Sequence, residues 1–159
     1  DEIGKSIIFA KNKNHATLLL KLFDEMYPQY NGKLAAIIHS DIKNKDDVLK
    51  RFKEEERPKI AISVDMLDTG VDVPEVVNLV FAKPIYSKVK FLQMIGRGTR
   101  LCPNLFGDGI DKEEFYIFDH WKNFEFFEEK PEGIVPRENK SSLQLRFESR
   151  LKLMEIFKS

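Results

Sequence analysis

Short runs of apolar residues recur along the chain, and amphipathic segments separate several of them. Apolar runs of roughly four to eight residues are typical of strands that are buried on both faces of a parallel sheet. They predict strands at residues 6–10, 34–38, 59–64, 76–82 and 115–119.

Apolar residues at helical spacing predict helices between these strands. The first begins near Asn14, stops at Pro28, and has an apolar stripe made of Leu18, Leu19, Leu22, Phe23 and Met26. The second covers residues 46–56 and is anchored by Val48, Leu49 and Phe52. The third begins at Ser87 and ends in the segment 93–100.

Strands that alternate with helices in this way imply right-handed crossovers and a mostly parallel sheet covered on both sides, which is an α/β fold. Residues 1–127 are expected to form this domain. Residues 128–159 are expected to form a linker and a C-terminal helix that begins near Ser141 and leads out of the domain. The apolar face of that helix either packs back on the sheet or docks on a neighbouring domain.

The composition is that of an ordinary globular domain, with 42% apolar and 33% charged residues. Lys plus Arg and Asp plus Glu both total 26, so the net charge neither supports nor excludes nucleic-acid binding by a local basic face. The single cysteine, Cys102, rules out an internal disulfide and fits a reducing, cytoplasmic environment. No apolar run approaches the ~18 residues of a membrane span, so we expect no membrane partner.

The chain begins at Asp1 without an initiator methionine and runs almost directly into a predicted buried strand. We therefore expect it to be a piece of a longer protein.

Polar residues follow the predicted strands at the points where the strands end. Ligands of parallel α/β sheets sit beyond these carboxyl ends, so the polar residues indicate a functional edge. They are Lys11 and Asn12, His39 and Ser40, residues 65–72, and Lys83.

The segment Gln93-Met-Ile-Gly-Arg-Gly-Thr-Arg100 combines a glutamine with two glycines and two arginines. If it is the end of a helix, Arg97 and Arg100 leave the same face about one turn apart. Gly96 and Gly98 let a ligand or another backbone come close. Paired guanidiniums suit a polyphosphate, because each planar fork chelates two oxygens. The alternative is a pair of surface arginines that favour a helix C-terminus through its dipole.

The loop after the third predicted strand contains three acids, Asp65, Asp68 and Asp72. Such a cluster is able to bind a divalent metal, but Gly70 and Pro74 favour a loop that presents backbone groups, and we expect no metal site. Asp72 is suited to accept a hydrogen bond from a ribose hydroxyl. Thr69 is suited to contact a nucleic-acid phosphate.

Two other side chains have less specific signals. His39 is able to act as a general base, but no nucleophile accompanies it and a hydrogen-bonding role is favoured. Cys102 has no cysteine or histidine at ligand spacing, which argues against zinc. The sequence also lacks a Gly-x-x-x-x-Gly-Lys-Ser/Thr loop and an Asp-Glu-x-His run. Arginines without a phosphate cradle indicate a half-site that another domain completes.

Together these segments resemble the C-terminal RecA-like domain of superfamily 2 helicases and translocases. Residues 5–15 resemble helicase motif IV, residues 65–74 resemble motif V, and residues 93–100 resemble motif VI. His39-Ser40-Asp41 matches the histidine segment of the family. The resemblance covers residues 5–120 and implies a RecA-like three-layer sandwich of the P-loop NTPase type.

The resemblance implies that an N-terminal RecA-like domain of the same parent chain supplies the phosphate cradle and Mg²⁺, and that ATP binds between the two domains. Arg100 then corresponds to the arginine finger, Arg97 to a second phosphate-sensing arginine, and Gln93 to the residue that faces the nucleotide. Gly70 and Asp72 match motif V positions near the nucleotide. The residues expected to lie at the nucleic acid are Lys11, Asn12, His39, Ser40, Asp65 and Thr69.

Within the superfamily, the glutamine and the run Gly-Arg-Gly-Thr-Arg-Leu-Cys-Pro look most similar to the motor subunits of type I restriction enzymes. This implies duplex DNA as the partner, together with methyltransferase and specificity subunits. A DNA-repair helicase, an RNA helicase and a non-catalytic RecA-like binding module are the alternatives. Degenerate modules usually lose the motif VI arginines, and both are present here, which favours a working motor.

Overall fold

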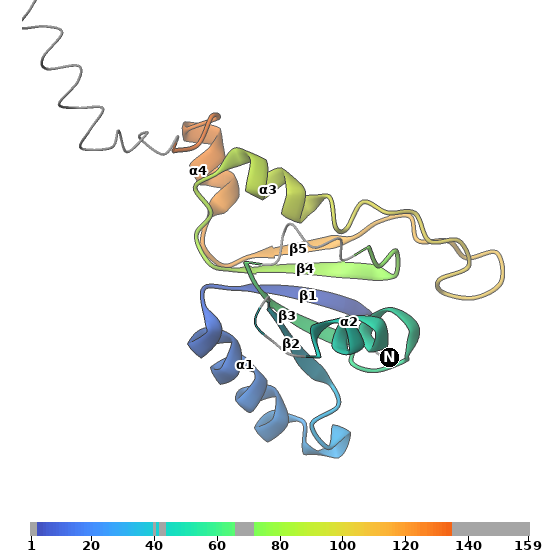
Figure 1. The fold of residues 1–159 in the computed structure, drawn as a ribbon. Coiled ribbons are helices and arrows are strands. Elements are labelled where there is room, and N and C mark those ends of the chain that lie inside the picture. Colours follow the sequence, from blue (N-terminus) through green and yellow to red (C-terminus); the bar gives the residue numbers. More distant parts are fainter. Residues whose placement is uncertain (1–2, 40, 42–43, 66–71, 135–159) are drawn as a thin grey trace, which may run out of the picture.

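The structure is a computed structural model, and it describes residues 3–39, 41, 44–65 and 72–134. The described strands form a sheet in the order β2-β3-β1-β4-β5, and every neighbouring pair is parallel (Figure 1). The strands are β1 (Lys5–Ala10), β2 (Ala35–His39), β3 (Ile60–Val64), β4 (Val76–Ala82) and β5 (Tyr116–Asp119). Their ends lie within one residue of the predicted ones, so the predicted parallel α/β sheet is confirmed.

Helices cover both faces of this sheet, and Figure 1 shows α1 and α3 on opposite sides of it. The helices are α1 (Lys13–Met26), the short 3-10 helix η1 (Pro28–Tyr30), α2 (Lys45–Glu54), α3 (Lys88–Ile95) and α4 (Asn123–Glu129). The three predicted helices are confirmed as α1, α2 and α3. The helix α4 was not predicted, because its sequence is short and rich in aromatic residues.

The period-two alternation of strand side chains divides the core into two layers. On β1, Ile7 and Phe9 pack with the core on the side of α2 and α3, where Phe52 is fully buried. Ile8 and Ala10 point to the other side and pack with the core beneath α1. A strand that is buried on both faces has a continuous apolar sequence, which is why residues 6–10 predict β1 correctly.

The apolar stripe predicted for α1 is wrong in part. Leu18, Leu22 and Met26 are exposed, with Met26 67% exposed. The face that packs on the sheet is formed by Ala16, Leu19, Leu20 and Phe23. Both sets follow helical spacing, and the fully buried Ala16 shows which one lets the helix approach the strands closely.

The ends of α1 and α3 have local causes. Asn12 caps α1, because its Oδ1 accepts a hydrogen bond from the backbone N–H of His15 at 2.9 Å. This cap moves the helix start slightly before the predicted Asn14. Ser87 caps α3 through its Oγ, which accepts from the backbone N–H of Lys90 at 3.4 Å.

The chain stays in contact with the domain beyond residue 127. The backbone N–H of Ile134 donates to the carbonyl of Tyr86 at 2.8 Å, and Ser87 pairs with Gly133 in an isolated antiparallel bridge. The predicted C-terminal helix from Ser141 lies outside the described residues. The division into residues 1–127 and 128–159 stays a prediction.

Candidate functional site

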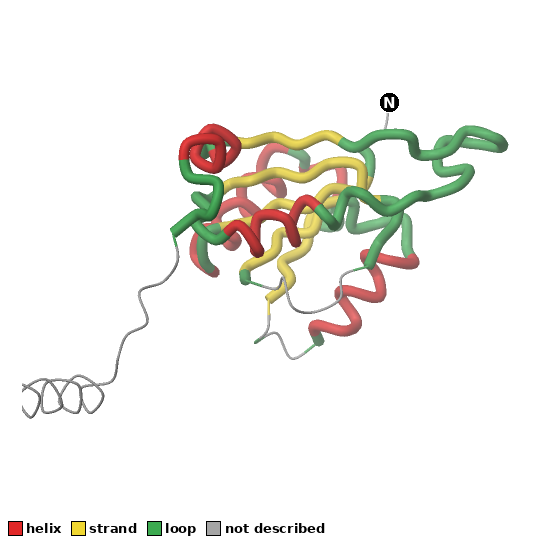
Figure 2. The backbone as a smooth tube through the Cα atoms, turned by 90° about the horizontal axis from the view of Figure 1, so that it is seen from above, coloured by secondary structure: helices red, strands yellow, loops and turns green. Residues whose placement is uncertain are grey.

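Because the strands are parallel, their starts share one edge of the sheet and their ends share the opposite edge. The chain returns along α3 between β4 and β5, so the end of α3 lies near the strand starts. Figures 1 and 2 both show the long loop between α3 and β5 at the end of the sheet where β1 begins. The predicted site residues are divided between the two edges.

At the edge of the strand starts, a shallow pocket of about 230 Å³ gathers the predicted nucleotide-facing side chains. We call Asp72, Gln93, Arg97 and Arg100 the arginine edge; together with Gly96 they line this pocket. The Nε atom of Arg100 lies 3.0 Å from Oδ1 of Asp72, and both side chains are more than half exposed. An exposed ion pair of this kind is weak, so an arriving polyanion is able to take the place of Asp72.

The position of Asp72 corrects an expectation. Residues 65–72 were expected together at the strand ends, but Asp72 lies just before β4, at the strand starts. The physical reason is that β3 and β4 are parallel, so the chain between them must cross from one edge of the sheet to the other. Asp65 and Asp72 therefore belong to different edges.

The expectation that the two arginines share one helix face is wrong. The helix α3 ends at Ile95, Arg97 lies in the turn that follows, and Arg100 lies beyond that turn. Beyond the helix, Gly98 packs closely on Phe115, and a Cβ atom at this position would lie 2.3 Å from the ring. The close approach that was expected from a ligand or another backbone is thus made, at Gly98, by the side chain of Phe115. Both arginines nonetheless line the same pocket.

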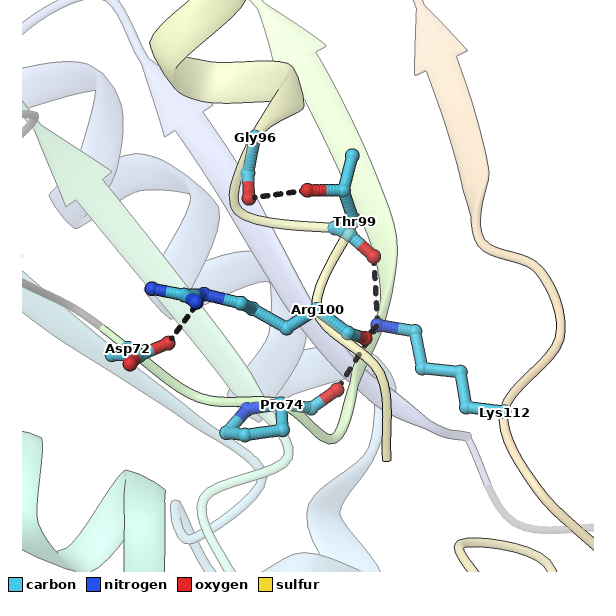
Figure 3. A network of polar contacts seen from close by, with 7 residues as sticks. Asp72, Pro74, Gly96, Thr99, Arg100 and Lys112 are labelled. Atoms are coloured by element: carbon cyan, nitrogen blue, oxygen red, sulfur yellow. Dashed lines mark hydrogen bonds and ion pairs between the residues drawn. The ribbon is translucent and has the colours of Figure 1, made fainter. Parts of the chain in front are cut away.

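A buried lysine supports the arginine edge from below, and sequence reasoning missed it. Lys112 is 4% exposed, and its ammonium donates to the carbonyls of Pro74 at 3.0 Å, Gly98 at 2.7 Å and Arg100 at 3.0 Å (Figure 3). Burial lowers the pKa of Lys112, and the electrostatic effect of the nearby Cys102 partly opposes this shift. The run of charged residues around Lys112 is typical of a solvated loop, so its pattern does not indicate burial.

At the edge of the strand ends, we call Lys11, Asn12, His39, Asp65 and Lys83 the polar rim. A second pocket of about 490 Å³ brings Lys11 and Lys83 together with Lys90 of α3. Lysine side chains that line one pocket are suited to the phosphates of a nucleic-acid backbone. The rim thus has a local basic pocket although the chain as a whole is neutral.

The remaining rim residues make local contacts. Lys83 forms an ion pair with Asp65, with Nζ 3.0 Å from Oδ1. The Nδ1 atom of His39 accepts from the backbone N–H of Asp41 at 3.2 Å, which fits the favoured hydrogen-bonding role. Asp41 itself pairs with Lys13. Ser40, Thr69 and Gly70 lie outside the described residues, and their predicted roles stay predictions.

The polar rim also has a buried support. Asn123 is 1% exposed, and its Oδ1 accepts from the backbone N–H of Ile85 at 2.7 Å. Its Nδ2 donates to the carbonyl of Lys83 at 3.2 Å and to Oδ1 of Asp119 at 2.8 Å. Asp119 also accepts from the backbone N–H of Phe124 at 3.1 Å, which fixes the start of α4. The end of β4 is thereby tied to α4.

Two kinds of feature are absent from the part of the chain that the structure describes. In residues 3–39, 41, 44–65 and 72–134, no group of three or more His, Cys, Asp or Glu side chains is placed to hold a metal ion. None of the helices in this part of the chain has both the length and the apolar character needed to cross a membrane.

Comparison with known proteins identifies the domain. Residues 1–102 match the model of the helicase conserved C-terminal domain. The chain is 33% identical over 123 residues to the type I restriction enzyme EcoKI endonuclease subunit of Escherichia coli (strain K12), covering 72% of this chain and 10% of that protein. It is 30% identical over 101 residues to the putative ATP-dependent helicase IRC3 of Saccharomyces cerevisiae (strain ATCC 204508 / S288c), covering 62% of this chain and 14% of that protein.

Among solved structures, the C-terminal domain of the DEAD-box protein Dbp5 superposes with a TM-score of 0.51 and 26% identity, covering 77% of this chain and 65% of that one. This similarity confirms the RecA-like three-layer fold. The chain spans only about a tenth of the length of the EcoKI subunit. Because the matched model covers more than half of its residues, the chain belongs to the helicase conserved C-terminal domain family and is a RecA-like domain of the superfamily 2 helicases.

Proposed function

We propose that this domain is the second RecA-like motor domain of an ATP-dependent DNA translocase, the motor subunit of a type I restriction enzyme. In this proposal the arginine edge faces ATP and the polar rim faces the DNA backbone. An N-terminal RecA-like domain of the same parent chain supplies the phosphate cradle and the ligands of Mg²⁺. Methyltransferase and specificity subunits are the expected protein partners.

The observation that carries the proposal is the pocket in which Gln93, Arg97 and Arg100 converge. Two permanently charged guanidiniums and an amide fit the oxygens of a polyphosphate. Asp72 contributes one carboxylate there, and one carboxylate alone does not hold Mg²⁺ with the several ligands that it requires. The pocket therefore fits the phosphate end of ATP and leaves the metal to the other domain.

Arg100 is the residue expected to act on the reaction itself. When the two domains close, its guanidinium leaves Asp72 and binds the oxygens of the terminal phosphate, where negative charge develops as the phosphoryl group is transferred. A residue in this role contributes on the order of 10³–10⁵ in turnover. Domain closure then couples hydrolysis to movement along the strand.

The choice of a DNA translocase rests on two findings of similarity. The motif VI run resembles those of type I restriction motors, and the EcoKI endonuclease subunit is 33% identical over 123 residues. The similarity to IRC3, described as a putative ATP-dependent helicase, and to the DEAD-box protein Dbp5 keeps a DNA-repair or RNA helicase as the second candidate. A non-catalytic binding module is the third.

The test is an ATPase assay on the parent protein with linear duplex DNA, single-stranded DNA or RNA. We expect duplex DNA to stimulate hydrolysis most strongly. Stimulation by RNA alone would move the domain to the RNA helicases, and no hydrolysis with any nucleic acid would favour the binding module.

In the same assay, Arg100→Ala is expected to lower kcat for ATP at least about 10³-fold while ATP binding changes little. The matched control is Arg51→Ala, which removes an exposed arginine of α2 that pairs with Glu55 at 3.3 Å. It should leave turnover within about twofold of the parent. Equal turnover of the Arg100→Ala variant and the control would refute the assignment of Arg100.

A further inference from the structure

Lys112 places a buried positive charge among backbone carbonyls. The ammonium has three donors, and the structure gives it three carbonyl acceptors, on Pro74, Gly98 and Arg100. Its own backbone N–H donates to the carbonyl of Cys102 at 3.0 Å. Both the backbone and the side chain of Lys112 are thus fixed to the loop that carries Arg100.

The three acceptors come from two separate segments of the chain. Pro74 belongs to the segment that begins with Asp72 and leads into β4, whereas Gly98 and Arg100 belong to the loop after α3. Lys112 belongs to a third segment, which leads into β5 (Figure 3). A single side chain therefore sets the distance between the backbone of Arg100 and the backbone that carries Asp72.

The chemistry of this junction favours lysine over other residues. Three carbonyls converge from different directions, and an ammonium offers three donors and no acceptor. A guanidinium would hold its donors in one plane, and an amide has only two of them. Burial of a charge costs free energy, so a neutral apolar side chain of similar length would avoid that cost but would leave the carbonyls without donors.

We propose that Lys112 is a positioning residue for ATP hydrolysis. Its ammonium holds the backbone of Arg100 against the segment that carries Asp72. The backbone position from which the exposed Arg100 guanidinium reaches the terminal phosphate of ATP is thereby fixed. This inference rests on the proposed function of Arg100. It adds a supporting residue that does not line the pocket of the arginine edge. Lys112 itself makes no contact with the nucleotide.

The test measures ATP turnover of the full nucleic-acid-stimulated protein with Lys112→Met, which keeps the side-chain length and removes all three donors. We expect kcat to fall about 10- to 100-fold while KM for ATP stays within about threefold, because a displaced Arg100 loses contacts made in the transition state. The matched control is Lys21→Met, which removes an exposed lysine of α1 that pairs with Glu25 at 3.5 Å. It should leave both constants unchanged.

A double-mutant cycle separates positioning from general damage to the fold. In an Arg100→Ala background, Lys112→Met should change the residual single-turnover rate by less than about twofold, because the residue it positions is gone. The same fold-reduction of kcat in both backgrounds would overturn the proposal. So would a kcat of the Lys112→Met variant equal to that of the parent.

If the methionine variant does not fold, Lys112→Gln carries the same cycle. Its amide keeps two donors, and we expect kcat to fall about 3- to 10-fold with Arg100 present and by less than twofold without it. A loss that is independent of Arg100 would again overturn the positioning role. If Arg100→Ala alone leaves turnover unchanged, the proposed function fails instead, so the two failures are distinguishable.

Discussion

The arginine edge and the polar rim lie at opposite ends of the same parallel strands and are built in different ways. At the arginine edge, Arg100 is exposed, Arg97 is half-buried, and the ion pair between Asp72 and Arg100 is solvated on both sides. At the polar rim, Lys83 is 14% exposed and its ammonium contacts Asp65. The ion pair of the first edge is thus open to a ligand on both sides, whereas the lysine of the second edge is mostly covered and held by Asp65.

The buried side chains that support the two edges also differ in the groups they bind. Lys112 meets only carbonyls, whereas Asn123 meets one N–H group, one carbonyl and one carboxylate. An ammonium donates and never accepts, and an amide does both, so each support matches the groups that converge on it. The backbone at each edge is therefore held by its own buried side chain, and we expect that substitutions can disrupt either edge without the other.

The largest effect on stability is expected at the support of the polar rim. Asn123→Ala removes one acceptor and two donor contacts from a side chain that is 1% exposed. It leaves the backbone N–H of Ile85 buried without its partner, so the free energy of unfolding should fall by about 2–4 kcal/mol. Urea unfolding monitored by circular dichroism measures this change.

The matched control for that experiment is Asn14→Ala, which truncates an exposed asparagine in the first turn of α1. It should alter the unfolding free energy by no more than about 0.5 kcal/mol. An equal effect of both substitutions would show that the Asn123 contacts do not hold the rim.

The next largest effect is expected at the arginine edge, from Gly98→Ala. The added Cβ would lie 2.3 Å from the ring of Phe115, so the ring or the loop must move. We expect the free energy of unfolding to fall by about 1–3 kcal/mol, as in other overpacked sites, again measured in urea.

Gly96→Ala is the control for this prediction, two residues earlier in the same loop. A Cβ atom at Gly96 would lie 3.3 Å from the carbonyl oxygen of Leu92, four positions earlier in α3. The backbone of Gly96 already has helical dihedral angles. This substitution should change stability by less than about 0.5 kcal/mol. If Gly98→Ala leaves the free energy of unfolding unchanged, the ring of Phe115 moves without loss of stability. The loop would then not require a glycine at position 98.

The sequence predicted those parts of the molecule that depend on local periodicity. The buried strands and the gathering of Gln93, Arg97 and Arg100 followed from apolar runs and from one short segment. The packed face of α1 did not follow, because Leu18 and Leu19 belong to two stripes that are equally apolar, and only contact with the sheet selects one of them.

The supports of the two edges were missed for a related reason. Lys112 lies among acidic residues, where a lysine is usually solvated, and its partners are 12 to 38 positions away in the chain. Asn123 has partners up to 40 positions away. Carbonyl acceptors carry no signature in the sequence, since every residue has one. A buried polar residue that binds distant backbone is visible only in three dimensions.

The smallest effect is expected from the exposed chemistry of the polar rim, and it concerns nucleic acid rather than ATP. Lys83→Ala removes one ammonium from the pocket that it shares with Lys11 and Lys90, so the affinity of the parent protein for duplex DNA should fall about two- to fivefold. The slope of log affinity against log salt should become shallower by about one charge, because one phosphate contact is lost. ATP turnover at saturating DNA should stay unchanged, in contrast to Arg100→Ala.

Asp65→Asn sharpens this last prediction by reversing its sign. Asp65 forms an ion pair with the ammonium of Lys83 at 3.0 Å. Asparagine at position 65 removes the negative charge. It also tolerates the left-handed backbone there, where φ is 50°. Release of Lys83 should raise DNA affinity by up to about threefold, and the effect should vanish in a Lys83→Ala background. Filter binding across a salt series measures both variants. If neither changes the affinity or the salt slope, the rim does not contact DNA, and the nucleic-acid contact must be sought on another surface of the domain.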